Sequence, residues 1–393
     1  MKRSSIVVAI ALLATSACAS SSGDKDSASN SPIEVGILAP FSGDLGYWGE
    51  GYRRGVDTYE AQFGKMSVGG RDVKLKQLDD QCDVATSVAA FQRESKNLVA
   101  VLGPPCSAVV QAVEPLAAKS KVPLMILAQS ASLTVDQADG WLFRLTQPDT
   151  ANLYSFAKQM VDGWSGAGVQ KVAVLHDTSV LNKDVGVQWK QAAEGSGIDV
   201  VADISFELGD TDFTSQILKT KQSGATAVAI ASYGPEIAQL VKQLDDAKVN
   251  VLIAASTDAA YPSTIKAAGD AIEGASFYSD YLAGSDNQGL KDFEAEFAKL
   301  HPDVKPQALE YEAYIGAGLL MDALKKTNGE GGAALQQALL GANFDVGDLT
   351  VRFLPNGDQE TVVTVIGEVK GGQPVVNNFV EEQRRSFPDL AGS

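Results

Sequence analysis

Short apolar runs alternate with amphipathic stretches along most of this 393-residue chain, starting at Ile33. Apolar runs of strand length separated by helical patterns are typical of βαβ units, in which parallel strands form one sheet with helices on its faces. The pattern predicts two series of strands, at residues 33–39, 73–78, 99–102 and 123–127, then at 171–175, 200–206, 227–231 and 251–254. Two separate series predict an α/β fold with two doubly wound, Rossmann-like lobes.

The helices we expect lie between these strands, at residues 49–62, 84–96, 107–119, 151–161, 212–222 and 236–247. The last third of the chain departs from this alternation, because residues 289–300 and 307–325 are consecutive helical patterns without a strand between them. The final segments have the pattern of a β-ribbon at residues 349–354, 361–369 and 374–376, with turns at Asn356-Gly357 and Gly371-Gly372.

These late elements predict how the chain is divided between the lobes. The consecutive helices have no sheet of their own, so we expect them to cover the first lobe, while the ribbon adds to the second. Residues 141–144 would carry the chain across, and three hinge crossings are expected, near residues 145, 282 and 354. Lobe I then takes residues 33–145 and 282–354, lobe II takes 146–281 and 355–378, and 379–393 form a C-terminal tail.

The N-terminus has the layout of a secretory signal peptide at residues 1–17. Lys2 and Arg3 precede an apolar run at residues 6–13, and small residues then lead to Cys18. This ending resembles a bacterial lipobox, which predicts that Cys18 is lipidated and that residues 18–32 form a flexible tether. Thr15 stands where a branched aliphatic residue is usual, which leaves cleavage by an ordinary signal peptidase as the alternative. Either route places the mature protein outside the cytoplasmic membrane.

The charge of the chain excludes one class of partner. With 32 Lys and Arg against 49 Asp and Glu, the formal net charge is −17. Nucleic-acid binding needs a basic face, so no nucleic-acid partner is expected. No apolar run after Cys18 is long enough to cross a bilayer, so the only membrane contact we expect is the lipid anchor.

The two remaining cysteines, Cys82 and Cys106, form an even pair in an oxidising compartment. A disulfide between them would close a loop of about 25 residues and stabilise the fold by about 3 kcal/mol. A metal site is the alternative, but two thiols without a nearby histidine are a poor set of ligands.

Motifs of known catalytic sites are missing from the sequence. It has only two histidines, and it lacks a P-loop, a G-x-S-x-G elbow, an H-E-x-x-H motif and a G-x-G-x-x-G fingerprint. His176-Asp177 could orient a nucleophile, but nothing in the sequence designates one, and a strand-end pair facing the cleft is the plainer interpretation. We expect no catalytic residue, cofactor or metal.

Candidate ligand contacts stand where the expected strands end, since doubly wound sheets bind ligands at that edge. Ser107 follows Gly103-Pro-Pro-Cys106 and opens a helix, where its hydroxyl would either cap the helix or donate to a carboxylate. Asp258 could balance an ammonium group, or it could be a helix cap or a solvated acid. Further candidates at strand ends and strand-to-helix loops are Trp48, Cys106, Ala128, Gln129, Ser130 and Tyr233.

Five segments in order carry a resemblance that spans about residues 33–378. They are IEVGILAPFSG (33–43), LDDQCD (78–83), GPPCS (103–107), SLT (132–134) with FR (143–144), and AGDAIEG (268–274). The chain resembles the branched-chain amino acid binding proteins of ABC importers, which have the fold of type I periplasmic binding proteins.

This resemblance implies a role for each candidate. It assigns the ligand carboxylate to Ser107 and the Ala128–Ser130 loop, and the ammonium to a carbonyl of that loop and to Asp258. Aromatic rings at Trp48 and Tyr233 would close over the ligand, and Cys82 with Cys106 would form the disulfide found in this group.

The sequence departs from the family pattern at the site. Trp48 stands where tyrosine is common, Gln129 replaces a small residue, and Leu181 falls where an aromatic residue is expected. The expected ligand is therefore a branched-chain or related apolar amino acid, with another small solute, such as an aromatic acid or amide, as the alternative. A ligand-sensing receptor or an enzyme is a further alternative. The expected partners of this monomer are the small-molecule ligand and ABC permease subunits.

Overall fold

The structure is a computed structural model that describes residues 31–130, 133, 140–147, 156, 164, 168–281, 284 and 287–383. From Pro32 onward these residues belong to one compact unit. The predicted signal peptide, Cys18 and nearly all of the tether lie outside the described residues. Of the helix expected at residues 151–161, only Phe156 is described.

The first sheet has six strands in the order β2-β3-β1-β4-β5-β6. All neighbours are parallel except β2 and β3. Its central strands are apolar on both faces, as is usual for parallel strands covered by helices on each side. The strands are β1 (Ile33–Ala39), β2 (Ser67–Val68), β3 (Arg71–Asp79), β4 (Ala100–Leu102), β5 (Leu124–Ile126) and β6 (Leu142–Arg144).

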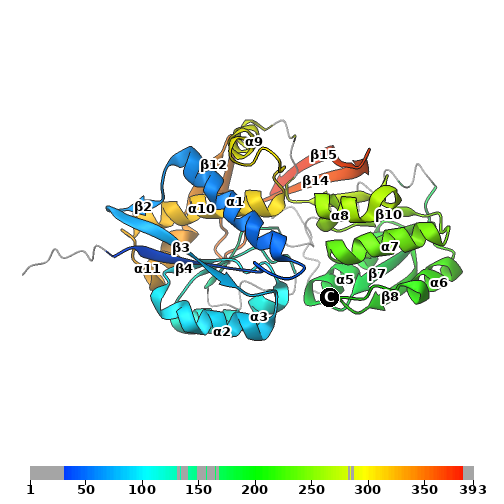
Figure 1. The fold of residues 1–393 in the computed structure, drawn as a ribbon, viewed down its shortest axis with the longest axis horizontal. Coiled ribbons are helices and arrows are strands. Elements are labelled where there is room, and N and C mark those ends of the chain that lie inside the picture. Colours follow the sequence, from blue (N-terminus) through cyan, green and yellow to red (C-terminus); the bar gives the residue numbers. More distant parts are fainter. Residues whose placement is uncertain are drawn as a thin grey trace, which may run out of the picture. The chain divides into compact units, whose positions relative to one another are not determined.

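Helices pack on both faces of this sheet, with α2 and α3 on one face and α1 with α10 on the other (Figure 1). Helices α1 and α10 approach closely because Gly55 has no side chain: a Cβ there would lie 2.2 Å from the Glu310 carbonyl oxygen. The helices are α1 (Gly46–Phe63), α2 (Val84–Glu94), α3 (Ser107–Ser120), α9 (Gln288–Leu300), α10 (Ala308–Lys326) and α11 (Gly332–Leu340), with a 3-10 turn η1 (Ser95–Asn97).

The second sheet has seven strands in the order β15-β14-β11-β10-β9-β7-β8. The five strands from β7 to β11 run parallel, whereas β14 pairs antiparallel with β11 and with β15. The strands are β7 (Lys171–Asp177), β8 (Asp199–Phe206), β9 (Ala227–Ala231), β10 (Leu252–Ala255), β11 (Ser276–Ser279), β14 (Thr361–Lys370) and β15 (Gln373–Gln383).

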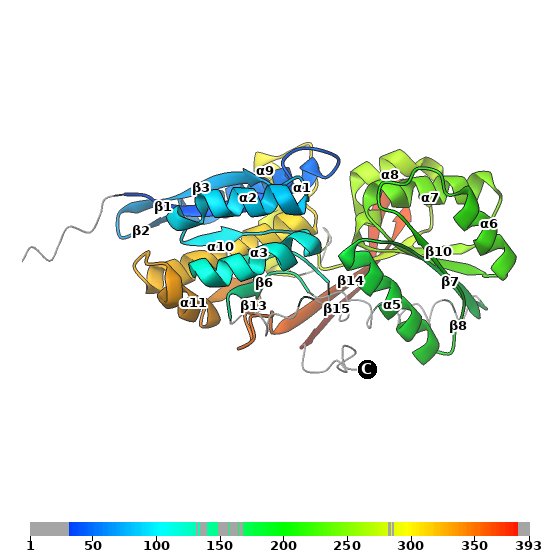
Figure 2. The ribbon, with the colours of Figure 1, turned by 90° about the horizontal axis from the view of Figure 1, so that it is seen from below.

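Two apolar cores cover the two faces of the second sheet. Ile217, Ile237 and Ile265 belong to one core, and Val185 and Trp189 belong to the other. Figure 2 shows the corresponding helices, with α5 on one side of these strands and α6, α7 and α8 on the other. Their bounds are α5 (Val180–Gly195), α6 (Thr214–Ser223), α7 (Gly234–Asp246) and α8 (Pro262–Ala268), with 3-10 turns η3 (Thr257–Ala260) and η4 (Gly269–Ile272).

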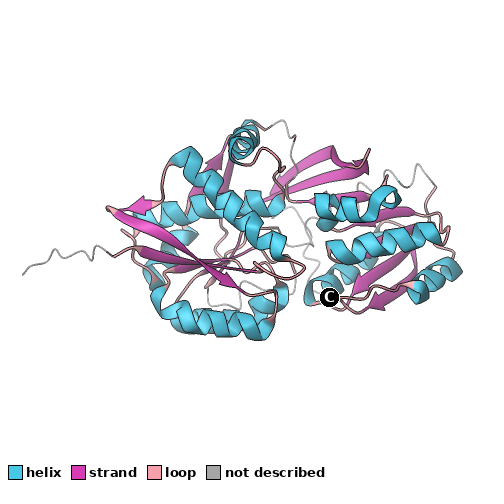
Figure 3. Ribbon diagram, in the orientation of Figure 1, coloured by secondary structure: helices cyan, strands magenta, loops and turns pink. Residues whose placement is uncertain are grey.

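The predicted α/β architecture with doubly wound parallel sheets is confirmed, and Figure 3 shows the strands of both sheets between layers of helices. The chain passes from the first sheet to the second after β6, returns to α9 and α10 after β11, and reaches the second sheet again at β14. As expected, α10 covers the first sheet and the ribbon β14–β15 extends the second.

Several elements differ from the prediction. Residues 142–144, expected to connect the lobes, form the edge strand β6, and residues 349–352 pair with β12 (Asn343–Val346) as β13 (Leu349–Arg352) in a separate two-stranded sheet. Strand β15 continues to Gln383, beyond residue 378, where we expected lobe II to end. Strand β11 was not predicted, because its Ser-Phe-Tyr-Ser sequence is short and begins and ends with polar residues.

Candidate functional site

A pocket lies where strands of both sheets end, and residues that follow strands of both sheets line it. Most of its wall is apolar or aromatic, which suits a small organic molecule, while a few polar groups would fix the orientation of that molecule. Its lining residues are Trp48, Pro105, Leu127, Gln129, Leu181, Asn182, Val185, Ser232, Tyr233, Ser256, Thr257, Asp258, Tyr261, Tyr278, Ala308, Leu309 and Glu312.

Aromatic rings from the two halves of the described chain meet at this pocket. The Trp48 ring, near the start of α1, meets the Tyr233 ring edge to face, with ring centroids 5.5 Å apart. Tyr47 and Tyr261 form a second such pair at 5.7 Å. Edge-to-face pairs of this kind add stability beyond the area that they bury, so these contacts help to hold the two sides of the pocket together.

Asp258 is one of two acidic residues that the structure describes in the pocket wall, and only 5% of it is exposed. It follows β10 within the turn η3, and its Oδ2 accepts hydrogen bonds from the Gly234 backbone N–H at 3.0 Å and the Tyr47 hydroxyl at 3.4 Å. The pKa of Asp258 is raised to about 7, mainly by burial; these two hydrogen bonds oppose the rise and nearby Glu236 adds to it. A cation in the pocket would favour its charged form.

Glu312 is the second acid of the wall, and it comes from α10, which packs on α1. Only 3% of it is exposed, and its Oε1 has no hydrogen-bond partner among the described residues. Burial raises the pKa of Glu312 well above its usual range, and the neighbouring Asp280 adds to this shift. Burial thus favours the neutral form of this side chain, and its Oε1 is an acceptor without a partner among the described residues.

Two buried donors near the pocket also lack partners among the described residues. They are the indole N–H of Trp48 and the hydroxyl of Ser107. Buried polar groups in folded proteins are nearly always hydrogen-bonded, so a cluster of unpaired ones points to a ligand or ordered water. Within the pocket wall, a donor at Trp48 and an acceptor at Glu312 would suit a molecule that has both an acceptor and a donor.

Comparisons with known proteins agree with this geometry. The family model described as "Periplasmic binding protein" matches residues 32–373. The chain belongs to the periplasmic binding protein family. Membership of this family implies a location outside the cytoplasm, and none of the described helices is long and apolar enough to cross a membrane.

Individual relatives are similar over most of this periplasmic binding protein. It is 26% identical to Leu/Ile/Val-binding protein homolog 2 of Brucella abortus over 298 residues, which is 74% of this chain and 77% of that protein. A leucine-binding protein from Thermotoga maritima aligns with a TM-score of 0.80 at 23% identity, covering 88% of this chain and 98% of that one. A solute-binding protein from R. palustris, solved with benzoate, gives 0.78 at 19% identity, with 88% and 96% covered.

Four of the eight ligand-binding residues expected from the sequence line the pocket: Trp48, Gln129, Tyr233 and Asp258. The other four, Cys106, Ser107, Ala128 and Ser130, are buried but are not part of its wall. Ser107 does not cap its helix, because it is the first helical residue and Cys106 occupies the N-cap position.

Arg144, which is 1% exposed, holds described residues that follow β5, at positions 128–130 and 133. Its guanidinium donates to the carbonyl oxygens of Ala128 and Ser130, each at 3.0 Å, and to that of Leu133. Its Nε donates to Asp358 Oδ1 at 2.9 Å in a buried ion pair. Arg144 thus already occupies one acceptor position on two of the loop carbonyls that could have accepted a ligand ammonium.

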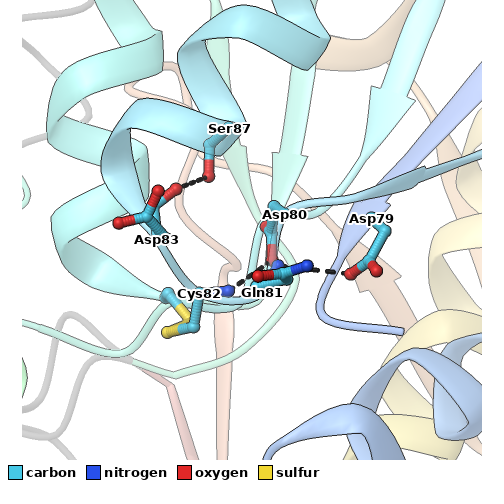
Figure 4. Close-up of a disulfide and its surroundings, with 7 residues drawn as sticks. Asp79, Asp80, Gln81, Cys82, Asp83 and Ser87 are labelled. Carbon is cyan, nitrogen blue, oxygen red and sulfur yellow. Dashed lines mark hydrogen bonds between the residues drawn. A yellow bond between two sulfur atoms is a disulfide. The ribbon is translucent and has the colours of Figure 1, made fainter. Parts of the chain in front are cut away.

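Cys82 and Cys106 are joined by a disulfide, with their Cα atoms 5.7 Å apart. The bond links the β3–α2 loop to the residue that precedes α3 (Figure 4). Asp80, beside it, accepts the Cys82 backbone N–H at 2.8 Å. Its pKa is raised to about 7, mainly by burial. The disulfide thus fixes the start of α3, next to Pro105 in the pocket wall.

Sequence reasoning missed part of this wall, including Glu312, Tyr261 and Asn182. Asn182 lies in α5, a helix absent from those that the sequence predicted, and its side chain donates to Asp177 at 2.8 Å. Asp177 also accepts the Ser232 hydroxyl at 2.8 Å, so it organises the strand ends of the second sheet.

Proposed function

We propose that this periplasmic binding protein captures an amino acid with a branched-chain or related side chain and delivers it to an ABC importer. The observation that carries this proposal is the charge of the pocket. Asp258 and Glu312 lie in the wall, and the lining residues that the structure describes include no Lys, Arg or His. A zwitterion brings its own ammonium to these acids, and apolar residues such as Leu127, Leu181 and Val185 suit an aliphatic side chain.

The ligand carboxylate needs donors, and the wall offers hydroxyl groups instead of a cation. Thr257 brings a hydroxyl to the pocket wall, and the Trp48 indole N–H is a further donor there. The hydroxyls of Ser232 and Ser256 already donate to Asp177 and to the Ser232 carbonyl oxygen. An aromatic acid such as benzoate is the second candidate, because a similar structure holds it. It would bring a negative charge beside Asp258 without an ammonium to offset it, so we expect it to bind more weakly.

We further propose a hinged mechanism for capture. Residues 33–145 with 282–354 would form one lobe and residues 146–281 with 355–378 the other, joined by three crossings. Support comes from the pocket wall, which draws Trp48 from one series of elements and Tyr233 and Asp258 from the other. A ligand that touches both sides favours the closed state and shifts the population toward it, and that state would be recognised by the permease.

Calorimetric titration of the purified mature protein tests the ligand class. We expect at least one aliphatic amino acid to bind in the micromolar range or tighter, about −8 kcal/mol or better. Benzoate and 4-hydroxybenzoate should bind at least about tenfold more weakly. Tight binding of a benzoate with no response to any amino acid would replace the first proposal with the second.

We also propose that Cys18 carries a lipid that anchors the protein to the membrane through the residue 18–32 tether. A Cys18→Ser variant should then move from the membrane fraction to the soluble fraction of whole cells, because serine lacks the thiol to which the lipid would be attached. Immunoblots of the two fractions measure this, with Cys82→Ser/Cys106→Ser as the control that keeps Cys18. A Cys18→Ser protein that stays with the membranes would show that the anchor lies elsewhere.

A further inference from the structure

Glu312 is a buried acid with no cation beside it. Two residues earlier on α10, Glu310 is equally buried, but it pairs with Arg54 at 2.6 Å and bonds the backbone N–H of Gln307. Within the described residues, Glu312 forms no ion pair with a basic side chain. It is buried, with 3% of its surface exposed, and it borders the pocket. A carboxyl group in this setting stays neutral and needs hydrogen-bond partners.

Asp280 is a hydrogen-bond partner of the Glu312 side chain. Asp280 Oδ2 accepts the Gln147 backbone N–H at 2.9 Å and the Thr146 hydroxyl, and Gln129 Nε2 lies 3.4 Å away. Three donors around one oxygen suit a carboxylate, so the neutral partner of this acid pair is Glu312, which hydrogen-bonds to Asp280. Oε1 of Glu312 has no hydrogen-bond partner among the described residues, so it is the oxygen left to accept a hydrogen bond.

We propose that Glu312 is a specificity-determining residue whose free Oε1 accepts a hydrogen bond from a hydroxyl or amide N–H on the ligand side chain. The inference rests on the proposed function, because it assumes that an amino acid fills the pocket. Asp258, from the second sheet, would meet the ammonium, while Glu312, from α10, would meet the side chain. The site then selects a side chain with a donor over an apolar side chain of the same shape.

An apolar ligand would be disfavoured because it leaves the Glu312 acceptor oxygen without a hydrogen-bond partner. A methyl group against Oε1 would bury the acceptor without a partner and without access to water, which is costly. Sites built around a buried polar group reject ligands that lack the matching group much more strongly than apolar sites reject an extra methyl. Glu312 also borders a second pocket of about 400 Å³ near Gln147 and Gln359, and a water there is the competing partner for Oε1.

Two pairs of amino acids with nearly equal shape test the proposal by calorimetry on the full mature protein. L-threonine differs from L-valine by a hydroxyl in place of a methyl, and L-asparagine differs from L-leucine by an amide in place of an isopropyl group. The wild-type protein should prefer the donor-bearing member of at least one pair by about tenfold or more. Glu312→Leu should abolish or reverse that preference, because it replaces the acceptor with an apolar group of similar size.

Glu312→Gln is the matched control, since its amide can donate to Asp280 while its carbonyl oxygen keeps the acceptor in place. It should retain the wild-type preference within about threefold, and thermal melting of each variant checks that it folds. Equal affinity within both pairs for the wild type would overturn the inference and leave the proposed function standing, with water as the partner of Oε1. Failure of every amino acid to bind would overturn both.

Discussion

Asp258→Asn should weaken the binding of the native amino acid by about 2–3 kcal/mol, or roughly 30- to 150-fold. Asparagine keeps the size and the acceptor oxygen that bonds the Gly234 N–H, but it removes the negative charge that faces the ligand ammonium. Ligands without an ammonium should lose little. Titration calorimetry with an amino acid and with its deaminated 2-hydroxy analogue separates the two effects.

Asp245→Asn is the matched control for this substitution. Asp245 lies on α7, its side chain is 63% exposed, and its removal changes the net charge by the same amount. Its affinity for the amino acid should stay within about twofold of the wild type, because exposed charges are screened by solvent. An Asp258→Asn protein that binds the amino acid as tightly as this control would show that Asp258 does not meet the ammonium.

The same residue predicts how binding depends on pH. With a pKa of about 7, Asp258 is largely protonated below that pH in the unliganded protein. A ligand ammonium favours the carboxylate, so binding at lower pH must release a proton, and affinity should fall by up to about tenfold per pH unit. Above about pH 7 the affinity should become independent of pH. In the Asp258→Asn variant the affinity should not depend on pH through this group at all.

Stability without ligand should change with pH in the opposite direction. The pKa of Asp258 is raised on folding from the usual value of 3.8. A carboxyl group with a raised pKa stabilises the folded state at low pH, and this contribution is lost as the pH rises through about 7. Chemical denaturation of unliganded wild type and Asp258→Asn between about pH 4 and pH 8 measures the difference.

Arg144→Met should lower the free energy of unfolding by about 3–5 kcal/mol, which is the largest effect on stability that we expect. Methionine fills a similar volume, but it leaves Asp358 buried without its cation and removes the donor to three loop carbonyls. The loop that carries Gln129 should loosen as well, so ligand affinity falls together with stability. Unfolding in urea, extrapolated to water, gives the magnitude.

Arg53→Met provides the comparison, because Arg53 pairs with Glu50 and Asp57 on the surface of α1 and its side chain is 47% exposed. It should cost less than about 1 kcal/mol. The double variant Arg144→Met/Asp358→Leu should recover part of the loss, since it removes the unpaired charge. If Arg144→Met is no less stable than Arg53→Met, the buried network does not hold this loop.

The architecture was predictable because apolar periodicity reports burial directly. The runs at residues 33–39 and 227–231 match β1 and β9 residue for residue. Elements whose polarity does not follow their burial were missed. Helix α5 begins with Val180-Leu-Asn-Lys183 and reads as a loop, although Ser179 caps it by accepting the Asn182 N–H.

The sequence predicted the site residues only where the order of strands alone brings them to the pocket. Trp48, Tyr233 and Asp258 follow strands directly or open the next helix, so the topology of a doubly wound sheet brings them to one edge. The roles proposed for Ala128 and Ser130 depend on which groups their carbonyls face, and Arg144, distant in the sequence, decides that. Glu312 reaches the pocket from a helix that joins the first sheet late in the chain, which no local pattern reveals.

The late position of β14 and β15 has a consequence for biosynthesis. Strand β11, with the buried Phe277, has only β10 beside it until residues 361–370 emerge from the ribosome and pair with its open edge. The second sheet is thus completed only when the chain is nearly finished. Because pairings between residues distant in the sequence form late, this order of strands delays completion of the second sheet. A chain truncated before residue 361 would expose the edge of β11, and we expect it to aggregate.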